Sequence, residues 1–242
     1  MLDTLKRLLG QAPPQIPGWA DLSAWARSHQ LTLRPVREPE GFVVEGRSGE
    51  LPWRLEWGPS QRSYIDGPEL RVRAELPVPR ELQALVLNRE LMETMEKTVF
   101  DQYVEGVQTR IDTTTPPEMR WLVMFPKLSS GELGTLREGF GALSSYKPWL
   151  QQWIGGPLAH ALAALPAESG RPLVLMIARR RLCLRTALAH PDTARLDTWL
   201  ALFATAVKEA QRVIIDDREA HASTQPSLFS ASVLPTEALR KG

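Results

Sequence analysis

The chain has 242 residues, of which 43% are hydrophobic and 24% charged, and its formal net charge is +1 at pH 7. The near-neutral charge argues against nucleic acid as a direct ligand, and the single cysteine, Cys183, excludes an intramolecular disulfide and a cysteine-based zinc site. No stretch approaches the roughly 20 apolar residues of a transmembrane segment, and residues 1–10 lack the apolar core of a signal peptide. We therefore expect a cytoplasmic protein, and the preference for Arg over Lys indicates a GC-rich bacterial source.

Two helices are predicted before the first strand. Residues 1–9 have the spacing of a short amphipathic helix, and a proline-rich linker follows to residue 18. Residues 21–29 predict a second helix, with Leu22 and Trp25 facing inward.

Four strand patterns come next. Within residues 51–57, Trp53 and Leu55 share one face and Arg54 and Glu56 share the other, which is the alternation of a half-buried strand. Short turns separate the strand patterns, and parallel pairing needs crossovers of a dozen or more residues, so an antiparallel meander is favoured. The four patterns are residues 31–37, 42–47, 51–57 and 69–76.

The rest of the chain mixes helices and strands around a Thr-Pro-rich break at residues 113–117. Before the break, residues 82–87 fit a strand or a helix, and residues 88–103 predict a helix. After it, Gly155-Gly156-Pro157 is expected to kink or split a helix, and Arg179-Arg180 form a tight turn between two strands. The predicted elements after the break are a strand at 119–125, helices at 132–144 and 148–165, strands at 173–177 and 182–186, and a helix at 192–215.

These elements predict an α+β fold, with an antiparallel β-meander in the N-terminal half and mixed helices and a β-hairpin in the C-terminal half. We divide the chain into an N-terminal helix and linker (1–18), an α+β N-terminal half (19–112), an α+β C-terminal half (113–217) and a flexible tail (218–242).

No motif predicts a catalytic, cofactor or metal site. The histidines lack metal-binding spacing, and the densest group of potential ligands, around Asp217 and His221, is too small for a catalytic metal. The serines lack a nucleophile elbow, and the glycines do not form a phosphate loop. We expect no cofactor and no metal. An enzyme, such as a hydrolase using Asp217 and His221 or the 101–103 region, stays open because catalytic groups converge in space.

The predicted hairpin carries one local basic patch, formed by Arg179, Arg180, Arg181 and Arg185. Guanidinium groups bind carboxylates and phosphates, so the patch is a candidate partner-binding surface. The alternative is an exposed turn whose arginines pair with nearby carboxylates. Two of these residues, Arg181 and Arg185, would lower the pKa of the Cys183 thiol, although a lone strand cysteine is most often an inert side chain.

The C-terminal tail contains Gln-Pro-Ser-Leu-Phe at residues 225–229. Gln225, Leu228 and Phe229 match the pentapeptide with which many bacterial DNA replication and repair proteins bind the sliding clamp, and the segment resembles that motif. Pro226 departs from the leucine usual at its position. The resemblance implies that these three residues contact the clamp, whereas the alternative is a solvated tail.

The sequence thus predicts a cytoplasmic, non-catalytic protein-binding or scaffolding domain that acts through a protein partner. A DNA-metabolism accessory factor that docks on the sliding clamp is the second hypothesis, and a hydrolase is the third.

Overall fold

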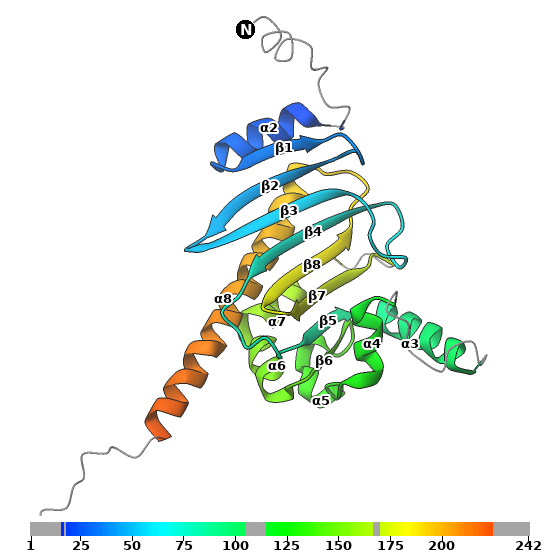
Figure 1. The fold of residues 1–242 in the computed structure, drawn as a ribbon, viewed down its shortest axis with the longest axis vertical. Helices are drawn as coiled ribbons and strands as arrows, with labels where there is room; N and C mark the ends of the chain where they lie inside the picture. The colour runs from blue at the N-terminus through cyan, green and yellow to red at the C-terminus, as the bar shows by residue number, and fades with distance from the viewer. Residues whose placement is uncertain (1–15, 17, 105–114, 167–169, 225–242) are drawn as a thin grey trace, which may run out of the picture.

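The computed structural model describes residues 16, 18–104, 115–166 and 170–224. Its strands form one eight-stranded antiparallel sheet in the order β1-β2-β3-β4-β8-β7-β5-β6 (Figure 1). The α+β class is confirmed. The strands are β1 (Thr32–Val36), β2 (Gly41–Ser48), β3 (Leu51–Pro59), β4 (Pro68–Glu75), β5 (Ala84–Asn88), β6 (Phe140–Ser144), β7 (Leu173–Ala178) and β8 (Arg181–Ala187).

The predicted meander is confirmed, because β1 to β4 each pair antiparallel with the next strand. β4 then pairs with β8, and β7 and β8 form the predicted hairpin. β5 precedes residue 113 in the chain but lies between β6 and β7. The two expected halves therefore contribute strands to a single sheet.

The helices lie on both sides of this sheet. The expected helix at 148–165 is split into α6 and α7 at Gly155-Gly156-Pro157, and α8 continues past its expected end near residue 215. Within the described residues, no helix combines the length and apolar character needed to cross a bilayer. The helices are α2 (Trp19–Ser28), α3 (Arg89–Val104), α4 (Pro117–Met124), α5 (Ser130–Leu133), α6 (Lys147–Trp153), α7 (Gly156–Ala163), α8 (Thr193–Thr224) and the 3-10 helix η1 (Gly134–Leu136).

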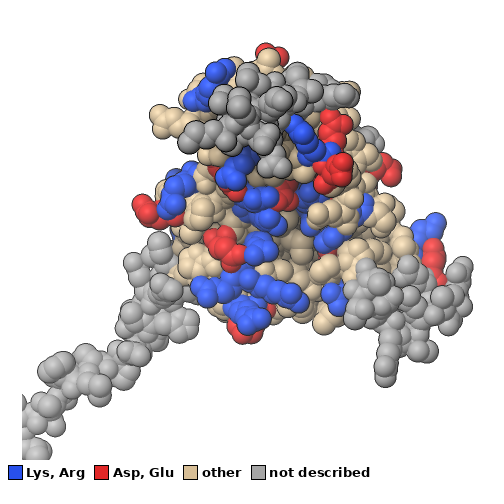
Figure 2. Space-filling model, turned by 45° about the horizontal axis from the view of Figure 1, so that its top comes forward, with Lys and Arg blue, Asp and Glu red and all other residues tan. Residues whose placement is uncertain are grey.

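Strand alternation gives the two faces of the sheet different characters. On one face, residues such as Leu55, Val72 and Leu184 pack with α2, α6, α7 and α8 in the larger hydrophobic core. On the other face, Leu85 and Leu87 of β5 pack with α3 and α4 in a smaller core. The part of this second face formed by β2 to β4 carries arginines and glutamates in ion pairs, and Figure 2 shows the two charge types intermixed.

The expected strand at residues 119–125 is wrong, because the chain forms helix α4 there. Pro117 lies in the first helical turn, where its missing N–H costs no hydrogen bond. Met119, Trp121 and Leu122 are buried at helical spacing rather than in alternation. The β-favouring residues of this segment misled the prediction, since packing overrides β propensity.

The expected helix at residues 132–144 is wrong beyond η1. Ser129 and Glu132 form a capping box that begins α5, but the helical conformation ends at Leu136. Gly139 and Gly141 disfavour helix, and the segment continues as strand β6. All five residues of β6 are buried, because four helices contact this strand: α3, α4, α5 and α6. Burial on both faces removes the alternation that would have revealed a strand.

Candidate functional site

Arg179 and Arg180 alone form the turn that joins β7 to β8. Ala178 and Arg181 are the register pair that closes it, and both turn residues are left-handed, with φ of 51° and 67°. Positive φ at both central positions is the signature of a type I′ hairpin turn, in which Asn-Gly is the preferred pair. For an L-residue with a Cβ, a left-handed conformation costs roughly 1–2 kcal/mol of free energy. The two arginines therefore occupy a turn that other residues would stabilise better.

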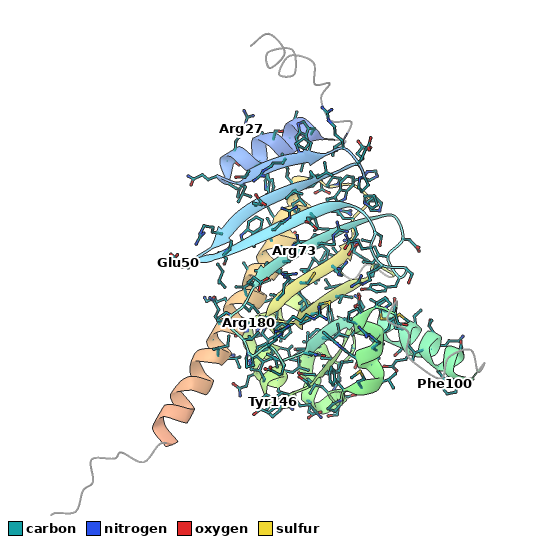
Figure 3. The ribbon with its side chains drawn as sticks, viewed as in Figure 1. Arg27, Glu50, Arg73, Phe100, Tyr146 and Arg180 are labelled. Carbon is teal, nitrogen blue, oxygen red and sulfur yellow. The ribbon has the colours of Figure 1, made fainter. Side chains whose placement is uncertain are left out.

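A groove of about 880 Å³ begins at this turn. Buried Trp149 lines it together with Ile214 of α8, so part of its wall is apolar. Tyr146 also lines the groove, and its side chain is 53% exposed. Figure 3 shows Arg180 and Tyr146 on the side of the molecule where α8 leaves the body. We call this feature the arginine groove, and the residues that define it are Arg80, Tyr146, Trp149, Arg179, Arg180 and Ile214.

The described lining of the arginine groove includes three arginines and no carboxylate. Among the side chains that the structure describes (residues 18–101, 115–166 and 170–214), no carboxylate forms an ion pair with Arg80, Arg179 or Arg180. All three are exposed arginines. Guanidinium groups bind carboxylates bidentately, and a neighbouring apolar wall strengthens such contacts by reducing solvent screening. The groove is therefore suited to a ligand that carries both carboxylates and apolar groups.

The four arginines predicted as one basic patch are separated by the fold. Arg179 and Arg180 lie in the arginine groove, whereas Arg181 donates to Glu75 at 2.7 Å. Arg185 is buried, and its Nη1 lies 2.5 Å from Oε1 of Glu69. Arg181 and Arg185 have the same parity along β8 and so lie on the charged face of the sheet. Arg181 and Arg185 therefore fit the alternative interpretation, in which the arginines pair with nearby carboxylates. Only Arg179 and Arg180 remain as the candidate basic patch.

A buried polar cluster joins β4 and β8 to the β3–β4 loop and α4. Glu118 is fully buried and accepts hydrogen bonds from Nε of Arg62 and the hydroxyl of Tyr64, each at 2.5 Å. Burial and the charge of Glu118 raise the pKa of Tyr64. Burial also raises the pKa of the Cys183 thiol, which is opposite to the shift expected from its neighbouring arginines. The ion pairs and hydrogen bonds of this cluster hold α4 on the sheet, while Oε2 of Glu118 and Nε of Arg185 are buried without a hydrogen bond among the described residues.

The other predicted site residues fall elsewhere. Gln225, Leu228 and Phe229 lie outside the described residues. Asp217 and His221 both belong to α8. In the described part of the chain, no three His, Cys, Asp or Glu side chains gather as metal ligands would.

Sequence reasoning missed Arg80, Tyr146 and Trp149 as partners of the turn. They come from the β4–β5 connection and the start of α6, which only the fold brings beside Arg179. The one signal present in the sequence was the Arg-Arg pair at a two-residue turn, where Asn or Gly is the rule.

Comparisons with known proteins identify no family. No protein-family model matches the chain, and no curated protein matches it. Among solved structures, it is similar to the crystal structure of the mycobacterial trehalose monomycolate transport factor A, TtfA. The TM-score is 0.43 and the sequence identity 9%, over 79% of this chain and 91% of that chain. A likeness this weak gives no support to a shared function.

Proposed function

We propose that this chain is a non-catalytic binding protein that holds an acidic segment of a partner protein in the arginine groove. The observation that carries the proposal is the pair Arg179-Arg180 at the rim of an apolar groove, where neither arginine forms an ion pair with a described side chain. Aspartates and glutamates of the partner would pair with Arg80, Arg179 and Arg180. Apolar side chains of the same segment would pack against Trp149 and the rest of the wall.

The backbone of the turn supports this assignment. Arg179 and Arg180 both adopt left-handed conformations that disfavour residues with a side chain. Natural proteins tend to depart from the locally most stable choice where a residue has a functional role. Two exposed arginines kept at such positions, with no ion pair in the described residues, are consistent with a role in binding rather than in folding.

The proposal is tested by Arg179→Asn combined with Arg180→Gly. This variant removes both charges and gives the turn its preferred residues, so a loss of binding cannot come from a weakened fold. In the full chain, a benzoylphenylalanine photocrosslinker replaces exposed Tyr146, and mass spectrometry identifies the crosslinked partner segment. We expect an acidic segment, whose crosslinks decrease with added salt because charge pairs at a surface are screened.

Arg37→Asn is the matched control, because Arg37 is exposed and has no ion pair in the described residues. It should keep the crosslinks that the double turn variant loses. Crosslinks that persist in the turn variant, or that map to segments without Asp and Glu, would contradict the proposal. A cytoplasmic location, clamp binding through the tail and hydrolase activity stay predictions that these experiments do not address.

A further inference from the structure

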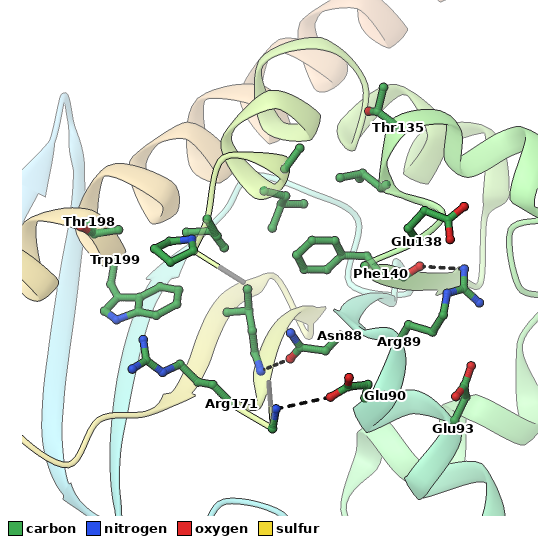
Figure 4. Close-up of a pocket in the computed structure, with 18 of the residues that line it drawn as sticks. Asn88, Arg89, Glu90, Glu93, Thr135, Glu138, Phe140, Arg171, Thr198 and Trp199 are labelled. Atoms are coloured by element: carbon green, nitrogen blue, oxygen red, sulfur yellow. Dashed lines mark hydrogen bonds between the residues drawn. The ribbon is translucent and has the colours of Figure 1, made fainter. Parts of the chain in front are cut away.

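A second cavity, of about 620 Å³, lies where β5 meets α3 (Figure 4). It shares no lining residue with the arginine groove. Cavities of a few hundred Å³ with an apolar interior and a few polar groups are typical small-molecule sites. We call it the β5 cleft.

The interior of the β5 cleft is apolar and comes from several elements. Leu136 of η1, Phe140 of β6, Leu162 of α7, Leu173 of β7 and Trp199 of α8 line it, and all five are buried. These side chains belong to the larger core, so their positions are fixed by packing. The cleft therefore offers a rigid apolar surface to a ligand.

One wall of the cleft is polar and held in place by side chain–backbone hydrogen bonds. Oδ1 of Asn88 accepts from the backbone N–H of Leu173, and Glu90 accepts from that of Gly170 at 3.3 Å. The guanidinium of Arg89 donates to the carbonyl of Phe140 at 3.3 Å. Figure 4 shows these contacts on the side of the cleft away from Trp199. The wall is thus ordered before any ligand binds.

The charges of this wall are of both signs. Arg89, Glu90 and Glu93 line the cleft from the first turns of α3, and none of them has an ion pair in the described residues. The other charged lining residues are engaged: Arg195 pairs with Asp192 at 3.1 Å, Glu138 with Arg137 at 2.9 Å, and Arg171 has a partner of its own. Among the described lining residues, the charged groups without an ion pair are therefore one guanidinium and two carboxylates.

From this arrangement we infer that the β5 cleft binds a small zwitterion that carries a hydrophobic group, such as a short hydrophobic peptide. The carboxylate of the ligand pairs with Arg89, its ammonium group pairs with Glu90 and Glu93, and its apolar side chains contact Phe140 and Trp199. A purely anionic ligand would meet two like charges, and a purely apolar one would leave the charged wall desolvated without a partner. This site is independent of the proposed partner-binding function.

The test uses the dipeptide Leu-Phe and its two capped forms, N-acetyl-Leu-Phe and Leu-Phe amide, in calorimetric titrations of the full chain. Capping removes one ligand charge at a time. We expect Leu-Phe to bind and each capped form to bind about tenfold more weakly or worse, the effect of losing one charge-assisted contact. Equal binding of the capped forms, or no binding of Leu-Phe at about 10 mM, a concentration that saturates even millimolar sites, would overturn the inference.

Variants place the binding in the cleft. Ala163→Trp fills the cleft from an exposed position on α7, so it should abolish binding without disturbing the core. Glu93→Gln should weaken binding of Leu-Phe about tenfold but leave binding of the acetylated form unchanged. Glu50→Gln, at an exposed glutamate that does not line the cleft, is the control and should change neither. Binding that survives Ala163→Trp would show that the dipeptide binds elsewhere and that the assignment is wrong.

Discussion

Arg185 of β8 and Glu69 of β4 form a buried ion pair across neighbouring strands, with Nη1 2.5 Å from Oε1. The second oxygen of Glu69 accepts from Arg71 at 3.1 Å and from the backbone N–H of Gln61 at 2.8 Å. Glu69 thus connects the ion pairs on the charged face of the sheet, through Arg71, to the buried side chain of Arg185. A charge in this position is tolerated only while its partners are present.

Replacing Glu69 by Ala should destabilise the protein strongly. Arg185 would remain buried without its carboxylate, and breaking such a pair costs about 3–5 kcal/mol. Urea unfolding followed by tryptophan fluorescence measures the change. Glu50→Ala is the control, since Glu50 pairs with Arg47 on an exposed turn, and such pairs contribute about 0–1 kcal/mol.

The double variant Glu69→Leu with Arg185→Met should recover most of the lost stability. It removes both buried charges and replaces them with apolar side chains of similar size, which is often neutral or stabilising. The same unfolding measurement applies. A double variant no more stable than Glu69→Ala would show that Arg71 or the backbone near Gln61 needs the carboxylate more than Arg185 does.

The substitution pair Arg179→Asn and Arg180→Gly should raise stability. Both positions have a left-handed φ. Residues that adopt this conformation more readily should raise the free energy of unfolding by about 1–2 kcal/mol in total, which would be measured as a higher Tm. Arg37→Asn is the matched control, because Arg37 is an exposed arginine without a left-handed backbone and without an ion pair in the described residues. A turn variant that melts at or below the temperature of the native protein would contradict the assignment of the turn.

Glu132 should make stability depend on acid pH. Its carboxylate accepts from the backbone N–H of Ser129 at 2.6 Å and lies 2.9 Å from Nζ of Lys147, and these contacts lower the pKa of Glu132 from 4.5 to about 2. A pKa that is lower in the folded state contributes stability that is fully present above about pH 4.5 and is lost as the pH falls to about 2.

The measurement compares the native protein with Glu132→Gln at several pH values. The difference in unfolding free energy should be largest near neutral pH, should fall below about pH 4.5 and should be mostly lost near pH 2, where about half of the Glu132 carboxylates of the folded protein are protonated. Lys147→Met should reproduce part of the effect, because it removes one of the contacts of Glu132. A difference that stays constant from pH 7 to pH 2 would mean that the charge of Glu132 does not stabilise the α5 cap.

Cys183 should react slowly with thiol reagents in the folded protein. Burial raises the pKa of its thiol, and only the thiolate is reactive. At pH 8, labelling with Ellman's reagent should be at least about tenfold slower in the native state than in urea. Fast labelling in the native state would show that β8 opens or that the neighbouring Arg185 dominates the environment of the thiol.

Local patterns in the sequence predicted a large part of this fold. The alternation of Trp53, Leu55 and Trp57 with Arg54 and Glu56 identified β3 and its buried face, because alternate side chains of a strand point to opposite sides. The Arg179-Arg180 turn and the break at Gly155-Gly156 were also visible in the sequence. The errors at α4 and β6 came from segments whose burial follows from several neighbouring elements.

The tertiary structure alone decided the candidate sites. The pairing of β4 with β8 placed Arg185 against Glu69 and separated it from Arg179, which no local pattern encodes. The arginine groove and the β5 cleft likewise combine side chains from distant parts of the chain. The sequence by itself determined most of the elements and their inward faces, α4 and β6 excepted, because these features depend on residues a few positions apart. Ion pairs and cavities depend on which elements become neighbours. The long-range packing of the sheet and its helices determines which elements those are.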